Sequence, residues 1–366
     1  MLIGIDGNEA NVERRVGISE YSFELLKKFE EFQISNFKFQ IYLKNYPLIY
    51  LPKEHDGWKY KVIGPKKLWT QIALPFDLYF HKPRPDVFFS PTHYAPRFSP
   101  VPTVISIMDL SYIRFPEMFK KSDLYQLRNW TSYSVNKAKK IFTISQASKN
   151  DIIKLYGISE GKVIVTYPGV RHKTAMQNSK IKEKYGIKED YILFVGTLQP
   201  RKNIVRLIEA FSKIQDKDID LVIVGKKGWM YEDILQAPKK YNVENRVKFL
   251  EFVSNEELQE FYKHAVCFIL PSLYEGFGLP ILEAMQYGCP VITSNVSSLP
   301  EAGGEAAIYV NPEDVDDMAK KIEMVISNKK IQEELREKGY KQAKKFSWER
   351  AAKETLKVLE EVANAG

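Results

Sequence analysis

The sequence alternates short apolar runs with longer segments of helical periodicity, and this alternation constrains the fold more than any other feature. Runs such as LIGID at 2–6 and IDLVIV at 219–224 are too short for ordinary helices. They are typical of strands buried on both faces of a parallel sheet, with helices between them. The sequence therefore predicts an α/β protein. The predicted strands are 2–6, 37–43, 86–90, 103–107, 140–144, 162–166, 191–195, 219–224, 247–250, 265–270 and 290–293, and the predicted helices include 17–31, 117–138, 203–215, 255–264, 280–287 and 313–327.

The pattern restarts after a polar stretch at 166–180, which indicates a linker between two domains. One doubly wound sheet holding all the predicted strands would exceed the ~10 strands that open sheets usually contain. We therefore expect two Rossmann-like domains, residues 1–170 and 171–346, whose strand ends share a ligand cleft. A helical tract at 329–363 is expected to cross back, so that about 347–366 joins the first domain.

Basic residues are unevenly distributed along a chain of otherwise ordinary globular composition. The 366 residues carry a net charge of +8. Residues 1–170 contain 24 Lys and Arg against 16 Asp and Glu, whereas the remainder contains 30 of each. The basic first half favours an anionic membrane or a lipid phosphate as its partner. Evenly solvated lysines and nucleic acid are the alternatives, and because no nucleic-acid motif is present we expect no nucleic-acid partner.

The sequence shows no targeting, disulfide or metal signal. The N-terminal residues lack the basic and apolar regions of a signal peptide, and no stretch approaches ~18 uncharged apolar residues. We expect a cytoplasmic protein, peripheral at most at the inner face of a membrane. Cys267 and Cys289 lie in apolar runs and are expected to be buried and reduced. The closely spaced aspartates at 216–220 are typical of a solvated turn, so no metal site is expected.

The segment PSLYEGFGLPILEAMQYGCPVITS at 271–294 carries the most specific chemical signal. A predicted strand ends there, and a glycine-containing loop leads into a helix opened by Pro280. Backbone N–H groups at such a turn, together with the helix N-terminus, favour an anion such as diphosphate. Glu275 and Glu283 are placed to accept hydrogen bonds from vicinal sugar hydroxyls.

A second signal is the pair Arg201 and Lys202, which lies between a predicted strand and a helix beginning near Asn203. In isolation such a pair is typical of a solvated surface. Beside a helix N-terminus, two cations are suited to hold a diphosphate.

The string EGFGLPILEAMQYGCPV resembles the glutamate–seven–glutamate signature of retaining GT-B glycosyltransferases, family four of the sequence classification. Further segments resemble the same family in the same order, so the resemblance covers essentially the whole chain. They include VGISEYSFELL at 16–26, IMDLSYIRFPE at 107–117, LFVGTLQPRKNIVRLIEAF at 193–211 and FSWERAA at 346–352.

The resemblance implies two Rossmann-like domains facing a cleft, with an acceptor in the first and a nucleotide-sugar donor in the second. Catalytic roles are implied for Glu275, at the donor sugar, and for Arg201 and Lys202, at the diphosphate, without a metal or a cofactor. Asp109 keeps a positional claim to catalysis, and Glu283 is expected to hold the ribose. The implied donor-binding residues are Gly17, Lys226, Val253, Gly276, Phe277, Gly278, Leu279 and Glu283.

One position departs from the family pattern, because Met108 stands where many relatives have histidine before the aspartate. Three interpretations remain open: the backbone at 108 suffices, the protein binds donor with weak activity, or another group such as His93 substitutes. The expected function is sugar transfer, with mannose as one candidate sugar, to a glycan or lipid-linked hydroxyl in cell-surface polysaccharide synthesis. A donor-binding protein, an epimerase or a phosphorylase on a similar fold are the alternatives.

Overall fold

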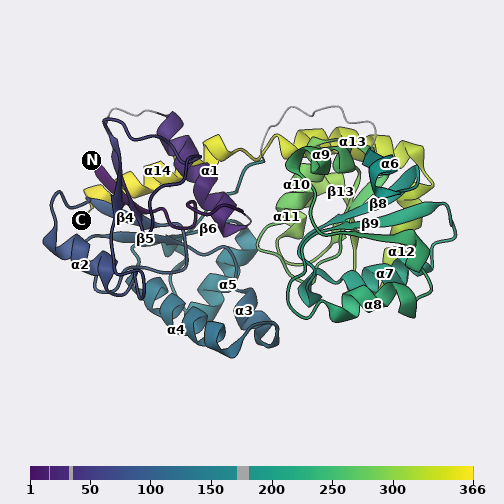
Figure 1. Cartoon of the computed structure of the whole chain (residues 1–366), viewed down its shortest axis with the longest axis horizontal. Coiled ribbons are helices and arrows are strands. Elements are labelled where there is room, and N and C mark those ends of the chain that lie inside the picture. Colours follow the sequence, from purple (N-terminus) through teal and green to yellow (C-terminus); the bar gives the residue numbers. More distant parts are fainter. Residues whose placement is uncertain (16, 33–35, 171–180, 366) are drawn as a thin grey trace. The chain divides into compact units, whose positions relative to one another are not determined.

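A computed structural model describes residues 1–15, 17–32, 36–170 and 181–365, and the chain divides into two compact units (Figure 1). The first unit comprises Met1–Gly169 and Ser347–Gly366, and the second comprises Val170–Phe346. Most of the expected linker, 171–180, lies outside the described residues. Each unit is built on one sheet whose strands all run parallel.

In the first unit the sheet has seven described strands in the order β3-β2-β1-β4-β5-β6-β7. The chain moves outward from β1 in one direction and then returns to continue from β4, so β1 and β4 flank the point where the strand order reverses. The strands are β1 Leu2–Asp6, β2 Lys38–Leu43, β3 Trp58–Val62, β4 Val87–Ser90, β5 Thr103–Ser106, β6 Lys140–Thr143 and β7 Val163–Val165, and the helices are α1 Ile18–Glu31, α2 Ala73–Phe80, α3 Ser111–Arg114, α4 Lys121–Lys137, α5 Gln146–Tyr156 and α14 Trp348–Asn364.

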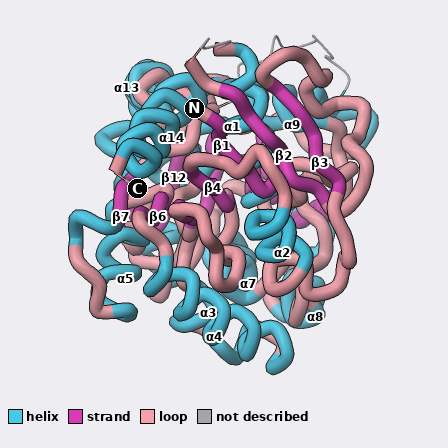
Figure 2. Tube along the Cα trace, turned by 90° about the vertical axis from the view of Figure 1, so that its left-hand side faces the viewer, coloured by secondary structure: helices cyan, strands magenta, loops and turns pink. Residues whose placement is uncertain are grey.

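Helices cover both faces of this sheet, as Figure 2 shows for α1 and α14 on one side and α2 and α4 on the other. The side-chain period of two in a strand explains why both faces are apolar. Ile41 and Phe89 belong to the core beneath α1 and α14, whereas their chain neighbours Tyr42 and Phe88 belong to the core beneath α2.

The last helix, α14, completes the core of the first unit. The ring centroids of Trp348 in α14 and Tyr21 in α1 lie 5.9 Å apart. Gly169 permits the close approach of the start of α14, because a Cβ at that position would lie 2.0 Å from the backbone nitrogen of Trp348.

In the second unit the sheet has six described strands in the order β10-β9-β8-β11-β12-β13, so β8 and β11 flank its reversal point. The strands are β8 Asp190–Val195, β9 Ile219–Val224, β10 Val247–Leu250, β11 Cys267–Leu270, β12 Val291–Ser294 and β13 Ala307–Val310, and the helices are α6 Ile181–Tyr185, α7 Ile204–Ser212, α8 Glu232–Lys240, α9 Asn255–His264, α10 Leu279–Gln286, α11 Leu299–Gly303, α12 Val315–Ile326 and α13 Lys329–Ala343.

The α/β prediction is confirmed, and every predicted strand coincides with an observed one to within one or two residues at each end. Two strands were not predicted. In β3 the exposed Lys59 interrupts the apolar run, and β13 is four residues long with two half-buried members. The helix predicted at 117–138 begins later, at Lys121, because Lys120 is extended. No described helix is both long enough and apolar enough to cross a membrane.

Candidate active site

The second unit brings a carboxylate and two cations together at its reversal point. Parallel strands place their carboxyl ends at one edge of the sheet, and ligands of such folds bind where the strand order reverses. The loop after β8 carries Arg201 and Lys202, and the loop after β11 carries Glu275. Because β8 and β11 are neighbours, side chains far apart in the sequence meet there.

A tight turn positions the side chains of Arg201 and Lys202. Pro200–Lys202 forms a 3₁₀ turn, and Asn203 then adopts a left-handed conformation with φ of 61°. The buried side-chain amide of Asn203 donates to the carbonyl of Pro271 at 3.0 Å and to the carbonyl of Pro312 at 2.7 Å. The backbone of Leu273 also donates to the carbonyl of Arg201 at 2.9 Å. These bonds fix the loop that carries Arg201 and Lys202 against the loop that carries Glu275.

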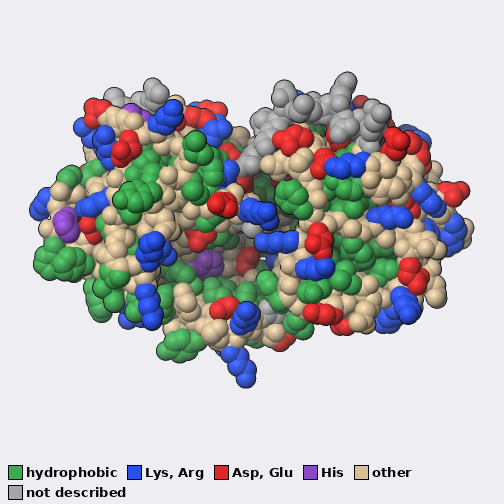
Figure 3. Space-filling view, viewed as in Figure 1, with side chains coloured by type: hydrophobic (Ala, Val, Ile, Leu, Met, Phe, Trp, Pro, Cys, Tyr) green, Lys and Arg blue, Asp and Glu red, His purple; other side chains and the backbone are tan. Residues whose placement is uncertain are grey.

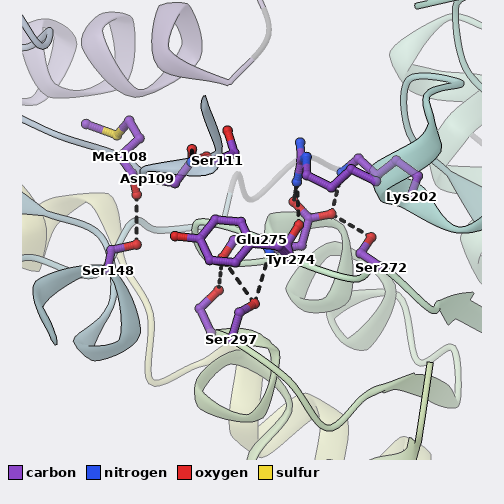
Figure 4. Close-up of polar contacts among 11 residues, drawn as sticks. Met108, Asp109, Ser111, Ser148, Lys202, Ser272, Tyr274, Glu275 and Ser297 are labelled. Carbon is purple, nitrogen blue, oxygen red and sulfur yellow. Dashed lines mark hydrogen bonds and ion pairs between the residues drawn. The ribbon is translucent and has the colours of Figure 1, made fainter. Parts of the chain in front are cut away.

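Glu275 lies at the centre of a buried cluster of donors (Figure 4). Arg201 Nη1 lies 2.9 Å from its Oε2, and Lys202 Nζ lies 2.5 Å from its Oε1. The hydroxyl of Ser272 donates to the same Oε1 at 2.7 Å. Burial alone would raise the pKa of Glu275, but the opposing effect of Lys202, Arg201 and Ser272 lowers it to about 2. The carboxylate is therefore ionised at neutral pH.

The backbone of Glu275 is also fixed by hydrogen bonds, on both its N–H and its carbonyl. Its N–H donates to Ser297 Oγ at 3.0 Å, and its carbonyl accepts from Ser298 Oγ at 2.8 Å. Both serines follow β12, the next strand of the sheet, and Ser297 has a positive φ of 51°. The sequence analysis did not identify Ser272, Ser297 or Ser298, because isolated serines after strands carry no distinctive spacing.

The glycine loop enters α10 as predicted. Gly278 precedes the helix with φ of 107°, and a Cβ there would lie 2.9 Å from Leu299. Pro280 occupies the first turn, and Gly278 supplies no side-chain cap to the first N–H groups of the helix. Phe277 is buried, and its ring centroid lies 5.3 Å from that of Phe346, so its side chain contributes packing. Gly276 is buried and Leu279 is half-buried in the same turn.

Glu283 lies within α10 and is half-buried. Its Oε2 accepts a hydrogen bond from the buried hydroxyl of Tyr262 at 3.1 Å. Burial, together with the Glu283 charge, raises the pKa of Tyr262 well above its usual range, so this phenol stays a donor. The two glutamates of the motif therefore have different protein partners.

The loops expected near the nucleotide base follow β9 and β10. Lys226 has an exposed side chain, and its carbonyl accepts the backbone N–H of Leu198 at 2.9 Å. That carbonyl is thus engaged in the fold. Val253 is half-buried and directly precedes Ser254, the N-cap of α9.

In the first unit the predicted site residues lie in loops after β1 and β5, and His93 follows β4. Gly17 precedes α1 with φ of 54° and has open space where a Cβ would stand. Asp109 Oδ1 accepts the backbone N–H of Ser111 at 2.9 Å. The carbonyl of Met108 accepts from Ser148 Oγ at 3.0 Å, as Figure 4 shows, and the Met108 side chain joins the core.

The charge of Asp109 acts on two titratable neighbours, His93 and Tyr112. Burial lowers the pKa of His93, and the charge of Asp109 partly opposes that shift. The Nδ1 atom of His93 is buried, and no described residue forms a hydrogen bond with it. Its ring centroid lies 6.0 Å from that of Tyr112. The imidazole therefore favours its neutral form beside the Asp109 carboxylate.

Two units in one chain, each built on a doubly wound parallel sheet, define the GT-B class of fold. Sucrose-phosphate synthase from Thermosynechococcus elongatus has this fold, with a TM-score of 0.79 at 18% identity over 100% of both chains. HepE from Anabaena, solved in complex with UDP-glucose, aligns with a TM-score of 0.73 at 18% identity over 98% of this chain and 99% of its own.

Sequence comparison identifies the family. Residues 177–342 match the glycosyl transferases group 1 and residues 43–174 match glycosyltransferase family 4. O-antigen chain mannosyltransferase B from Escherichia coli is 30% identical over 305 residues, which are 81% of this chain and 78% of that relative. The chain belongs to glycosyltransferase family 4, and the resemblance stated from the sequence is confirmed.

Proposed function

We propose that this protein is a retaining glycosyltransferase that moves a sugar, with mannose the first candidate, from a nucleoside-diphosphate sugar to a hydroxyl. The acceptor is a glycan or a lipid-linked glycan, and the process is the synthesis of a cell-surface polysaccharide. The proposal takes its sugar and its process from the Escherichia coli relative, whose name describes a mannosyltransferase of the O-antigen chain.

The observation that carries the proposal is the cluster of Arg201, Lys202 and Glu275. These three groups sum to one positive charge in a buried setting, which suits an incoming diphosphate. We propose that a bound diphosphate takes over hydrogen bonds from Arg201 and Lys202. The Glu275 carboxylate is then available to the hydroxyls of the donor sugar.

The proposed reaction proceeds on one face of the sugar. The bond from the anomeric carbon to the diphosphate oxygen breaks, and the acceptor oxygen bonds to the same carbon on the same side. The acceptor proton passes to the departing diphosphate oxygen. Arg201 and Lys202 stabilise the charge that develops on the diphosphate, so that the interaction is strongest in the transition state.

The other roles remain proposals of the same kind. Gly278 and Leu279 present backbone N–H groups to the diphosphate at the start of α10, and Glu283 accepts from the ribose hydroxyls. Lys226 and Val253 flank the nucleotide base through their backbones. The first unit binds the acceptor, with Gly17 allowing its loop to approach the substrates and with Asp109 taking part in catalysis.

Metal independence is part of the proposal. The two cations supply the charge that a divalent ion supplies in other nucleotide-sugar enzymes. Within the described ranges no three His, Cys, Asp or Glu side chains group in a way that could hold a metal ion.

A second candidate function is donor binding with weak turnover, and Met108 is the observation that favours it. Its side chain is uncharged and packs in the core, and its carbonyl accepts a hydrogen bond from Ser148. Residue 108 therefore offers no charged group to a substrate. An epimerase or a phosphorylase is the third candidate, although among the described residues neither an acid–base pair for epimerisation nor a cofactor lysine for phosphorolysis is evident.

The test is to incubate the full chain with GDP-mannose, UDP-glucose, UDP-N-acetylglucosamine or ADP-glucose and to measure nucleoside diphosphate release. Each donor is assayed with and without oligosaccharide acceptors, and the anomeric configuration of the product is determined by NMR. Release with a retained configuration supports the proposal. Binding that raises the melting temperature without any release would favour the donor-binding protein, and a changed free sugar nucleotide would favour the epimerase.

We further propose that the enzyme is cytoplasmic and contacts an anionic membrane through its basic first half. Residues 1–170 hold the whole net excess of positive charge. Such a location would bring the enzyme to a lipid-linked acceptor at the inner leaflet.

A further inference from the structure

An exposed apolar stripe lies on the first unit, along α2 and the turn that leads into it. Leu68 is 45% exposed, Ile72 51%, Phe76 58% and Phe80 71%, and Tyr79 beside them is 46% exposed. We call these five residues the aromatic stripe. Hydrogen bonds from the N–H of Ile72 to Leu68 and from the N–H of Phe76 to Ile72 continue the helical turn across the start of α2. Residues spaced by four therefore share one face.

The stripe is not used by the core of the first unit. The opposite face of α2 buries Ala73, Leu74 and Leu78 against the sheet. Along the stripe, the ring centroids of Phe76 and Phe80 lie 4.7 Å apart, so the side chains gather rather than scatter. Figure 3 shows hydrophobic side chains clustered at the left, over α2. A contiguous exposed apolar patch of this kind marks an interaction site.

Basic residues border the stripe, and exposed carboxylates are missing from its segment. Lys66, Lys67 and Lys82 are exposed at its two ends. Between residues 57 and 85 the sequence has one acidic residue, Asp77. Asp77 is buried, with Lys61 Nζ at 2.7 Å and His81 Nδ1 at 3.1 Å, so its charge is compensated within the fold. The surface therefore presents apolar rings between cations.

We propose that the aromatic stripe docks onto an anionic lipid surface, with its rings in the boundary between headgroups and acyl chains and with the lysines at the lipid phosphates. Rings with a basic border match the two parts of such a surface, one apolar and one anionic. A second copy of the chain would bring like charges together at the borders, which opposes self-association. The inference deepens the proposed membrane contact and rests on that part of the proposed function alone.

The experiment is co-sedimentation of the full chain with vesicles of phosphatidylcholine and phosphatidylglycerol in equal parts. Phe76→Ser with Phe80→Ser should weaken the partition coefficient on the order of tenfold or more. Lys66→Glu with Lys67→Glu should weaken it by at least about tenfold, and rising salt should do the same to the wild type. The matched controls are Tyr125→Ser, an aromatic that is 71% exposed on α4, and Lys329→Glu with Lys330→Glu in α13, and both should bind as the wild type does.

Insertion of the aromatic stripe into the vesicle membrane can be measured separately from binding, by fluorescence. The substitution Phe80→Trp should show a blue-shifted emission with these vesicles, and lipids brominated near the headgroup should quench it. The docking of the stripe would be overturned by the following result: the Lys66→Glu, Lys67→Glu variant loses vesicle binding, the Phe76→Ser, Phe80→Ser variant binds fully, and Phe80→Trp shows no spectral shift. A dimer that dissociates when Phe76 and Phe80 are replaced, without vesicle binding, would also overturn it and assign the stripe to self-association.

Transfer to a soluble oligosaccharide, measured without vesicles, separates this inference from the rest of the proposed function. The Phe76→Ser, Phe80→Ser variant should retain that activity, since the two replaced side chains are exposed and lie outside the buried core. Absence of transfer in every variant and in the wild type would contradict the proposed reaction but not the docking.

Discussion

Lys202 Nζ lies 2.5 Å from Oε1 of Glu275, and this contact joins two loops that are 73 residues apart in the sequence. Both side chains are largely buried, at 12% and 10% exposed, so the ion pair is sheltered from solvent screening. The contact gives Lys202 two roles. It neutralises Glu275 in the free protein, and it is proposed to bind the diphosphate when the donor is present.

Lys202→Ala should lower kcat/KM by ten- to a thousandfold, on the order of 1.4–4 kcal/mol of transition-state stabilisation. The side chain is largely buried and paired with Glu275, so its loss should also lower the free energy of unfolding. Removing one partner of a buried pair costs about 3–5 kcal/mol, and Arg201 and Ser272 should retain part of this. Chemical denaturation and steady-state kinetics measure the two effects. Lys213→Ala, which removes an exposed ion pair to Asp316, is the control and should change neither quantity appreciably.

Glu275 should make the protein sensitive to acid in a defined window. Its pKa is about 2 in the folded protein against an ordinary value of 4.5, so the folded state holds the carboxylate ionised more strongly than the unfolded state does. The stabilisation is fully present above pH 4.5 and is lost as the pH falls toward 2. One pKa unit corresponds to about 1.4 kcal/mol, so roughly 3 kcal/mol is involved.

Glu275→Gln should therefore reduce the free energy of unfolding at pH 7 and flatten its decline in this acidic window. Urea titrations across the window provide the measurement, with the exposed Glu313→Gln as control. A pH dependence identical to that of the wild type would show that Glu275 does not gain its stabilisation from the two cations.

The two glutamates should separate kinetically. Glu283→Gln keeps the shape but removes the charge proposed to accept ribose hydroxyls, so it should mainly raise the donor KM. Glu275→Gln should mainly lower kcat, because its contacts to the sugar are expected to strengthen in the transition state. Initial rates over a range of donor concentrations distinguish the two. If both variants changed only KM, Glu275 would have no catalytic role.

Turnover should survive an excess of EDTA, because Arg201 and Lys202 are proposed to supply the charge for the leaving diphosphate. Nucleoside diphosphate release is measured before and after chelation and again after Mg²⁺ or Mn²⁺ is added. Activity that disappears with EDTA and returns with either ion contradicts the role assigned to the two cations.

His93 should destabilise the protein as the pH falls. Burial lowers its pKa below the ordinary value of 6.5 against the opposing charge of Asp109. The unfolded chain therefore takes up the proton first, and stability present above pH 6.5 is lost as the pH falls below it. His93→Gln should flatten thermal stability between about pH 7 and pH 5, whereas the exposed His55→Gln should leave the profile unchanged. A profile for His93→Gln that matches the wild type would contradict a neutral imidazole at His93 in the folded protein.

Much of the fold could be predicted because strands buried on both faces leave a continuous apolar run in the sequence. The run IDLVIV at 219–224 became β9 without a change of bounds, and all six of its residues are buried. The edge strand β3 was not predicted, because it is not buried on both faces and so has no continuous apolar run. Lys59 is exposed, so burial on both faces did not shape its composition.

By itself the sequence determined the two parallel sheets, the glycine turn into α10 and the family, since these depend on local composition and on spacing along the chain. Tertiary structure decided which groups meet. No local pattern could pair Glu275 with Lys202, because the contact arises from the adjacency of β8 and β11, and that adjacency follows from the order of strands in the sheet. The same holds for the aromatic stripe. Leu74 and Phe76 are both apolar in the sequence, and only the packing of α2 buries the first and exposes the second.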